Sequence, residues 1–339
     1  MTGLPCPILD KDTETLIRNF NPAGIILFSR NIEDPLQLAT LCRDLQDAAV
    51  KYHGMPLFIS IDQEGGRVAR LKAPFTIFPG NEAIGKDENP LERAKEFGYT
   101  TATEMKLVGL NMNLAPVLDV RKGETERHLT GRTFSENHKT VAVLGAVVIK
   151  ALQDNGIMAV AKHFPGLGRA DMDPHYHLPV IKSEKEDIEK LNLHPFRSAI
   201  RARVAGIMTS HALYPSLDPE KPATLSSIIL SDLLRDRMGF KGLIITDDLE
   251  MGAITGNRSV AQAALNSFLA GADILLVCKE QQGLLDGIDL IRNKILSREI
   301  REEQLDQSIS RIMTAKRKYI EGIEKISLKK VEKYFALKS

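Results

Sequence analysis

The 339-residue sequence contains no tryptophan and only three cysteines. Without Trp, a small-molecule site lacks the best stacking platform for an aromatic ligand, a quaternary ammonium group or the face of a sugar. The cysteines, Cys6, Cys42 and Cys278, are odd in number and far apart, which argues against a disulfide framework. We therefore expect free thiols and a reducing compartment.

The sequence also lacks an excess of either charge and any long apolar run. Its 45 Lys and Arg residues balance 44 Asp and Glu residues, and the net charge of +1 provides no field that would attract a nucleic acid or an anionic membrane. No run approaches about 20 apolar residues, and the N-terminus lacks the basic opening and apolar stretch of a secretory signal. We expect a cytoplasmic protein without nucleic-acid or membrane partners.

Short apolar, β-branched runs alternate with longer segments of helical spacing along the whole chain. In the first helical segment Asp34 is a candidate N-cap, Pro35 stands at the first helical position and Gly54 follows as a stop. No linker or shift in composition interrupts the alternation, so we expect residues 1–339 to form one domain, with a C-terminal helix at about 302–320 and a basic tail at 326–339. The expected strands are Ala23–Phe28, Pro56–Ile61, Met112–Leu118, Met158–Ala161, Gly206–Met208, Gly242–Ile245 and Asp273–Val277.

This alternation predicts a parallel sheet covered by helices, which is either an open sheet or a closed barrel. Polar groups at the ends of many strands converge only if the sheet closes. We therefore predict the α/β class and a single (β/α)8 TIM barrel. Its first strand would be the stub Leu4–Ile8, abbreviated because Pro5 and Pro7 remove two backbone donors. The polar residues that follow the strands are Ser29-Arg30-Asn31, Asp62, Asp119, Lys162-His163, Ser210-His211 and Asp247-Asp248.

The densest group of titratable residues lies in the segment 162–179, where four such groups occur within the seven residues 171–177. Pro174 favours an extended conformation of Asp173, in which residues i and i+2 point the same way. We therefore expect Asp173 and His175 to lie side by side. A carboxylate beside an imidazole fixes its tautomer and raises its basicity, which suits a general acid/base. A solvated polar loop is the alternative.

Two adjacent carboxylates, Asp247 and Asp248, end the buried run that begins at Gly242. Neighbouring residues of an extended chain face opposite sides, so one carboxylate can enter the mouth of a barrel while the other turns outward. Asp247 is a candidate nucleophile. Capping of the next helix is the alternative role, and strand parity alone does not assign the two roles.

Charged groups at other strand ends are candidates for substrate binding. Asp62, with Arg70 after a Gly-Gly turn, can hold hydroxyls, a carbonyl or a carboxylate by directed hydrogen bonds, although a salt-bridged turn is equally compatible. Lys162 and His163 end a buried strand, where a charge without a purpose is costly. Arg132 taken alone is compatible with a solvated loop residue.

These motifs resemble those of the bacterial β-N-acetylglucosaminidases of glycoside hydrolase family three, the NagZ-like enzymes of cell-wall recycling. The Lys-His-Phe-Pro-Gly loop that ends in Asp-x-His is similar to the N-acetylglucosaminidase branch rather than to the β-glucosidase branch. The resemblance covers nearly the whole chain and includes Gly24-Ile-Ile-Leu-Phe-Ser-Arg-Asn31, Asp62-Gln-Glu-Gly-Gly-Arg67, Asn113-Leu-Ala-Pro-Val-Leu-Asp119, Lys162-His-Phe-Pro-Gly166, Thr209-Ser-His211 and Thr246-Asp-Asp-Leu-Glu-Met251.

The resemblance implies a retaining, exo-acting β-N-acetylhexosaminidase, monomeric and without metal or cofactor, that removes terminal N-acetylglucosamine from peptidoglycan-derived muropeptides. Asp247 becomes the nucleophile and His175 the acid/base, polarised by Asp173. Two loop residues depart from the family, because Arg169 replaces a frequent acidic residue and Pro174 replaces a usual Ser or Thr. The residues implied to hold the sugar are Asp62, Arg70, Arg132, Lys162 and His163.

Three alternative functions stay open. His175 and His177, with His163 and His211, could serve a metal-dependent amidohydrolase barrel, although the His-x-His pair lies on a loop rather than on a rigid strand. A neutral histidine repels phosphate less than a carboxylate does, which is compatible with a β-N-acetylglucosaminide phosphorylase. A non-catalytic sugar-binding barrel is the third alternative, although all the implied catalytic groups are present.

Overall fold

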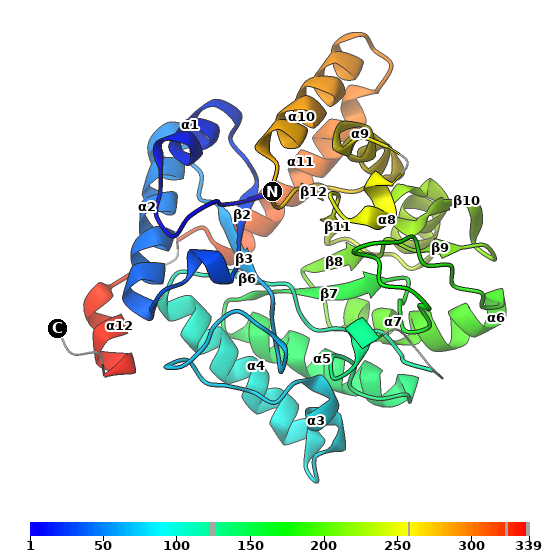
Figure 1. The fold of residues 1–339 in the computed structure, drawn as a ribbon, viewed down its shortest axis with the longest axis horizontal. Helices are drawn as coiled ribbons and strands as arrows, with labels where there is room; N and C mark the ends of the chain where they lie inside the picture. Colours follow the sequence, from blue (N-terminus) through cyan, green and yellow to red (C-terminus); the bar gives the residue numbers. More distant parts are fainter. Residues whose placement is uncertain (123–126, 257, 323–324, 337–339) are drawn as a thin grey trace.

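The computed structural model describes residues 1–122, 127–256, 258–322 and 325–336. Its main sheet has eight parallel strands, and each pairs with its neighbours in chain order. Thr2 also bridges Val277, just beyond the last strand, so the sheet closes on itself (Figure 1). The predicted (β/α)8 barrel is confirmed. Its strands are β1 (Thr2–Gly3), β2 (Gly24–Leu27), β3 (Phe58–Ile61), β6 (Met112–Asn113), β7 (Met158–Phe164), β8 (Gly206–Thr209), β11 (Leu243–Asp248) and β12 (Ile274–Leu276).

The first strand lies earlier in the chain than predicted. β1 pairs with β2, whereas the stub Leu4–Ile8 forms no ladder. Pro5 and Pro7 have no N–H to donate, so the pairing comes from the residues that precede them. β6 is also shorter than the predicted strand Met112–Leu118. It ends at Asn113, and the residues after it include Pro116, which has no N–H to donate to a ladder.

One long helix begins and ends at the residues that were predicted to cap and stop it. α2 (Pro35–His53) starts after Asp34, whose carboxylate accepts two N–H groups of the first turn, and it ends at Gly54 with a φ of 65°. The other long helices are α1 (Lys11–Phe20), α4 (Pro90–Leu107), α5 (His138–Asp154), α7 (Leu193–Arg201), the π-type η5 (Ile228–Arg237), α9 (Val260–Ala270), α10 (Gln281–Leu296) and α11 (Glu302–Tyr319). The shorter elements are η1 (Ser29–Asn31), β4 (Gln63–Gly65), β5 (Val68–Ala69), α3 (Asn81–Lys86), η2 (Arg127–Leu129), α6 (Lys185–Asp187), η3 (Ile188–Asn192), β9 (Leu213–Tyr214), β10 (Asp218–Pro222), η4 (Ala223–Leu225) and α8 (Gly252–Thr255).

The C-terminal segment packs on the barrel. The helix expected at about 302–320 is α11, and the basic tail contains a further helix, α12 (Leu328–Phe335), which lies beside α2 (Figure 1). Val331 is fully buried, and the ring centroid of Phe335 lies 4.7 Å from that of Phe75. Within the four described ranges, no helix is both long and apolar enough to cross a membrane.

Alternate residues of each strand face either the barrel interior or the surrounding helices. In β11, Leu243 and Ile245 belong to the apolar cluster inside the barrel, whereas Ile244 belongs to the layer under the helices. In β7 the same alternation places Val160 inside and Ala161 outside. This alternation determines which polar residues at the strand ends can enter the barrel mouth.

A buried carboxylate joins the last two strands to α11. One oxygen of Asp273 accepts the Ile244 N–H at 2.9 Å, and the other accepts the Ser308 hydroxyl at 3.0 Å and the Arg311 Nε–H at 2.8 Å. Asp273 also forms an ion pair with Arg235. Two guanidinium groups therefore depend on one fully buried side chain.

We predict that Asp273→Ala lowers the free energy of unfolding by about 3–5 kcal/mol, because it leaves two partly buried cations without their counter-charge. Urea denaturation measures the change. The control is Asp289→Ala, which removes an exposed pair with Arg292 and costs less than about 1 kcal/mol. Equal losses for the two variants would show that Asp273 does not hold this side of the barrel together.

Candidate active site

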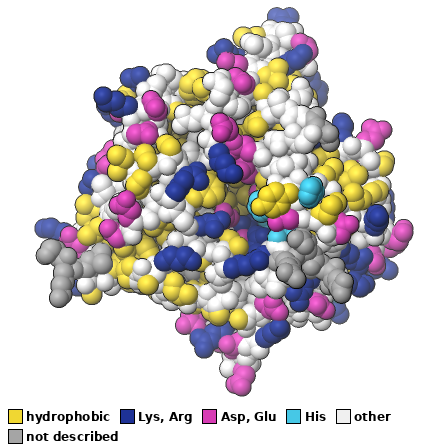
Figure 2. Space-filling model, viewed as in Figure 1, with side chains coloured by type: hydrophobic (Ala, Val, Ile, Leu, Met, Phe, Trp, Pro, Cys, Tyr) yellow, Lys and Arg dark blue, Asp and Glu magenta, His cyan; other side chains and the backbone are white. Residues whose placement is uncertain are grey.

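A cavity of about 180 Å³ opens at the carboxyl ends of the barrel strands. Figure 2 shows this face hollowed near its centre, with Lys and Arg side chains and a group of His side chains around the hollow. The carboxyl end of the strands is where TIM barrels bind their substrates. The polar side chains that line the cavity are Asp62, Glu64, Arg70, His128, Arg132, Lys162, His163, His175, Asp247 and Asp248.

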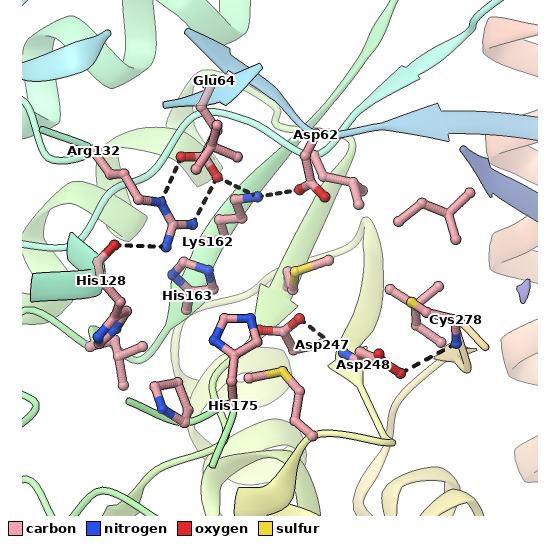
Figure 3. A pocket seen from close by; sticks show the side chains of 18 of the residues that line it. Asp62, Glu64, His128, Arg132, Lys162, His163, His175, Asp247, Asp248 and Cys278 are labelled. Carbon is pink, nitrogen blue, oxygen red and sulfur yellow. Dashed lines mark hydrogen bonds and ion pairs between the residues drawn. The ribbon is translucent and has the colours of Figure 1, made fainter. Parts of the chain in front are cut away.

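The alternation along β11 separates the roles of Asp247 and Asp248. Asp247 continues the parity of the interior residue Ile245, and one of its oxygens accepts the Asp248 N–H at 2.9 Å. The Asp248 carboxylate instead accepts N–H groups of Glu250 at 3.1 Å and Cys278 at 3.3 Å, so it stabilises the turn after the strand (Figure 3). Asp247 is therefore the carboxylate that follows the interior face of the strand into the cavity.

The surroundings of Asp247 keep it ionised. Burial alone would raise its pKa, but the imidazoles of His211 and His163 and the Asp248 N–H together lower the pKa of Asp247 below its ordinary value. Burial and the neighbouring Glu250 and Asp247 carboxylates raise the pKa of Asp248 to about 6. The two adjacent acids thus differ in pKa, and Asp247 is the stronger acid.

A buried ion network forms one wall of the cavity (Figure 3). The Lys162 Nζ lies 2.7 Å from an oxygen of Asp62 and 2.7 Å from an oxygen of Glu64. Arg132 donates from Nε and Nη2 to the two oxygens of Glu64, both at 2.8 Å. Arg70 lies 3.6 Å from the other oxygen of Asp62. Four of the predicted binding residues are thus parts of one cluster with Glu64 at its centre.

Mutual attraction keeps this network charged although it is buried. The cations Arg132 and Lys162 outweigh the cost of burial and hold the pKa of Glu64 far below its usual range. Asp62 and Glu64 in turn outweigh the desolvation of Lys162 and raise its pKa. Glu64 was not among the predicted binding residues. Its spacing of two residues from Asp62, which places both on one face of an extended chain, is the signal that would have identified it.

His163 is oriented by a buried carboxylate. Its Nδ1 lies 2.7 Å from an oxygen of Asp119, and the other oxygen of Asp119 accepts the Leu167 N–H at 2.6 Å. This contact fixes the orientation of the ring, and Nε2 is the ring nitrogen that lies away from Asp119. Asp119 ends one of the family-like motifs, but no role was predicted for it.

The predicted proximity of Asp173 and His175 is correct, but its basis is a turn rather than an extended chain. The Asp173 carboxylate lies 2.6 Å from Nδ1 of His175 and also accepts its backbone N–H at 3.0 Å. The carbonyl of Asp173 accepts the N–H groups of Tyr176 and His177, both at 3.1 Å. Partial burial opposes ionisation, but the two hydrogen bonds from His175 outweigh it and lower the pKa of Asp173.

Backbone hydrogen bonds attach this turn to the segment that follows Asp247. The carbonyl of His175 accepts the Gly252 N–H at 2.9 Å, and the carbonyl of Pro174 accepts the Ala253 N–H at 3.1 Å. His175 therefore lies at the cavity beside Asp247 (Figure 3). This attachment holds the imidazole and the carboxylate in one arrangement.

Of the two residues that depart from the family pattern, Pro174 lines the cavity and Arg169 does not. Arg169 points away from the reacting groups and binds the Ser183 hydroxyl at 2.9 Å and Asp187 of α6 at 3.0 Å, so it anchors the start of the loop. Pro174 lines the cavity next to His175. Neither residue replaces a reacting group.

The structure does not assemble the histidine set of the amidohydrolase alternative. His177 is exposed, and His211 binds the Thr224 hydroxyl at 2.7 Å and the Asp248 carbonyl at 2.9 Å. Among the residues that the structure describes, no three His, Cys, Asp or Glu side chains are grouped as metal ligands. His128, a further cavity residue, was also missed, because a single histidine in a polar segment gives no sequence signal.

A TIM barrel with carboxylates and an Asp–His pair at the carboxyl ends of its strands is compatible with a glycoside hydrolase. The family model of the glycosyl hydrolase family 3 N-terminal domain matches residues 8–315. The chain therefore belongs to glycosyl hydrolase family 3. The predicted family and the predicted class of enzyme, a β-N-acetylhexosaminidase, are confirmed.

Several curated proteins and solved structures are similar over most of the chain. The β-hexosaminidase of Nitrosomonas eutropha is 38% identical over 262 residues, which cover 76% of this chain and 74% of that protein. A β-N-acetylglucosaminidase from Paenibacillus superimposes with a TM-score of 0.91 at 34% identity, covering 99% of this chain and 66% of that chain. NagZ from Neisseria gonorrhoeae, solved with N-trifluoroacetyl-D-glucosamine, gives a TM-score of 0.81 at 30% identity, covering 98% of this chain and 92% of that chain.

Glu64 provides a prediction about the dependence of stability on pH. An acid whose pKa is lowered by folding stabilises the folded state above its unfolded pKa, and this contribution disappears as the pH falls. We predict that Glu64→Gln lowers the free energy of unfolding by about 3–5 kcal/mol at pH 7. The difference from the wild type should shrink steadily as the pH falls below the ordinary value of 4.5.

Urea denaturation at a series of pH values measures this difference. Glu92→Gln, at an exposed position of α4, is the control and should show no such trend. A difference that stays constant down to the lowest accessible pH would contradict the proposed ion network.

Proposed function

We propose that this protein is a retaining, exo-acting β-N-acetylhexosaminidase that hydrolyses terminal, non-reducing N-acetylglucosamine. The observation that supports this proposal best is the placement of Asp247 and of the His175–Asp173 dyad at one cavity, joined by backbone hydrogen bonds. Relatives named as β-hexosaminidases and β-N-acetylglucosaminidases support the same substrate class.

In the first step the Asp247 carboxylate attacks the anomeric carbon and forms an ester bond to the sugar. The bond to the leaving oxygen breaks as His175 transfers its proton to that oxygen. In the second step neutral His175 removes a proton from water, which attacks the anomeric carbon and releases Asp247. Asp173 stabilises the imidazolium that exists before the first transfer and after the second, because it holds the Nδ1–H.

The ion network would hold the sugar that is removed. Asp62, Arg70, Arg132, Lys162 and His163 surround the inner part of the cavity and offer charge-assisted hydrogen bonds to hydroxyl groups. The cavity is small and the chain has no Trp, so we expect recognition of one terminal sugar rather than of a long polysaccharide.

We extend the proposal to the biological context that the resemblance implies. The aglycone would be a peptidoglycan-derived muropeptide, and residues 1–339 would act as one monomeric, cytoplasmic catalytic domain without a cofactor. The similarity to Neisseria gonorrhoeae NagZ, of which this chain covers 92%, supports this choice.

Hydrolysis of an aryl β-N-acetylglucosaminide and of an aryl β-glucoside tests the proposal, with and without a chelator, in phosphate and in phosphate-free buffer. Proton NMR at early times should show the β-anomer of N-acetylglucosamine, formed faster than glucose and unaffected by the chelator. An initial α-anomer, a sugar 1-phosphate or loss of activity to the chelator would each contradict the proposed reaction.

We predict that Asp247→Ala lowers kcat/KM for every glycoside by more than about 10⁴-fold, because no other group can form the glycosyl ester. Added azide, a small external nucleophile, should restore turnover of an activated aryl substrate and give the α-glycosyl azide. Full activity of Asp247→Ala together with an inactive Asp248→Ala would assign the nucleophile to the neighbouring carboxylate instead.

We predict that His175→Ala loses about 10²–10⁴-fold in kcat on substrates with a poor leaving group, which need a proton. The loss should be far smaller in the glycosylation step of a dinitrophenyl glycoside, whose leaving group departs unprotonated. Pre-steady-state release of the phenol measures this step directly. His177→Ala, at an exposed position of the same turn, is the control. Equal losses on both leaving groups would exclude His175 as the acid.

A further inference from the structure

His128 is a buried polar side chain that lines the cavity and has no part in the mechanism above (Figure 3). It is only 8% exposed, and neither of its ring nitrogens has a hydrogen-bond partner in the described part of the chain. Buried polar groups are almost always paired. His163 and His175, the other cavity histidines, both have a carboxylate partner. An unpaired imidazole at this position therefore calls for a partner that arrives with the ligand.

The turn that carries His128 belongs to the sugar-binding network. The His128 carbonyl accepts a hydrogen bond from Nη1 of Arg132 at 3.3 Å, and Glu64 holds the remainder of that guanidinium. The ion network thus fixes the backbone of His128 beside the cavity. A half-turn about the Cβ–Cγ bond exchanges the nitrogen and carbon edges of the ring within nearly the same volume. Either edge can therefore be presented to a bound ligand.

The charge state of His128 matches a neutral, amide-like partner. Burial is the largest effect on its pKa, and together with the neighbouring His163 and Arg132 it lowers the pKa of His128 to about 4. The carboxylates of Asp173 and Asp119 oppose this shift only in part. At neutral pH the ring therefore has one N–H donor and one acceptor nitrogen. A secondary amide offers a carbonyl to the donor and an N–H to the acceptor.

His128 lies on the side of the cavity where the anomeric end of the sugar would bind. Asp173, which holds the acid/base His175, is the carboxylate that acts most strongly on His128. In the proposed reaction His175 and Asp247 lie at the anomeric carbon, and C2 is one of its two ring neighbours, so a side chain on this side of the cavity can reach the substituent of C2. Asp62 and Arg70 belong to a different part of the wall, which follows β3.

We propose that His128 forms a hydrogen bond with the 2-acetamido group of the bound sugar and thereby determines specificity for N-acetylglucosamine over glucose. This inference rests on the proposed function. The acetamido group projects farther from the sugar ring than a 2-hydroxyl group and brings both a donor and an acceptor. Its arrival pairs a ring nitrogen that is otherwise unpaired, and a glucoside leaves that nitrogen unpaired.

The wild-type protein separates this inference from the proposed function. If it does not hydrolyse an aryl β-N-acetylglucosaminide, the proposed function fails. If it does, kcat/KM for that substrate and for the aryl β-glucoside gives a selectivity ratio. We expect His128→Leu to lower this ratio about tenfold or more, mainly through the acetamido substrate. His128→Asn, which keeps a donor and an acceptor, should retain more of the ratio than His128→Leu does.

Thermal unfolding distinguishes this role from a structural one. His128→Leu removes an unpaired buried polar group, so its Tm should be unchanged or higher. His194→Leu replaces a half-buried histidine outside the cavity and should leave the selectivity ratio unchanged. An unchanged ratio in His128→Leu, or equal losses on both substrates with a lower Tm, would overturn the inference.

A measurement on the wild type keeps the test decisive if the variants do not fold. In ¹⁵N-histidine NMR spectra, free N-acetylglucosamine should shift the ring nitrogens of His128, whereas glucose at the same occupancy should not. Identical shifts with both sugars, or none with N-acetylglucosamine at saturation, would contradict a contact with the acetamido group.

Discussion

The active site depends on the buried ion pairs between Glu64 and its two cations, Arg132 and Lys162. These residues come from three segments that are far apart in the sequence, and each cation is desolvated and needs the carboxylate between them. Lys162 in turn binds Asp62, and Arg132 holds the turn of His128. The buried Glu64 carboxylate therefore positions the side chains that form one wall of the cavity.

The reacting groups that we propose, Asp247 and His175, are placed by a different kind of interaction. Asp247 is carried into the cavity by the alternation of β11, a rigid strand of the barrel. His175 lies on a loop, and its position depends on the Asp173 turn and on backbone hydrogen bonds to Gly252 and Ala253. Gly252 and Ala253 lie shortly after Asp247 in the sequence. If the loop broke these hydrogen bonds and moved, His175 would be displaced relative to Asp247. The sugar-binding wall and the acid/base can therefore be perturbed separately.

The local patterns predicted the barrel and its helices well, because periodicity, N-caps and stop glycines act within short segments. The first strand was predicted at Leu4–Ile8, but the prolines in that segment cannot donate backbone hydrogen bonds. Thr2 and Gly3, which precede it, form the pairing instead. Asp247 and Asp248 could be separated only after the interior cluster showed which parity faces inward. Glu64 had a local signal in its spacing of two residues from Asp62, but only the closed barrel brings its two cations to it. His128 escaped prediction because a single histidine gives no local signal and its place at the cavity depends on the fold.

In the reaction that we propose, Asp247 becomes covalently bound to the sugar during turnover. A fluorinated N-acetylglucosaminyl fluoride, which reacts quickly and is released slowly, should trap this species on His175→Ala. Mass spectrometry of the digested protein should then locate one added sugar on Asp247, and Asp247→Ala should remain unlabelled. Trapping of the sugar on another residue, or turnover that proceeds without any adduct under these conditions, would contradict the account.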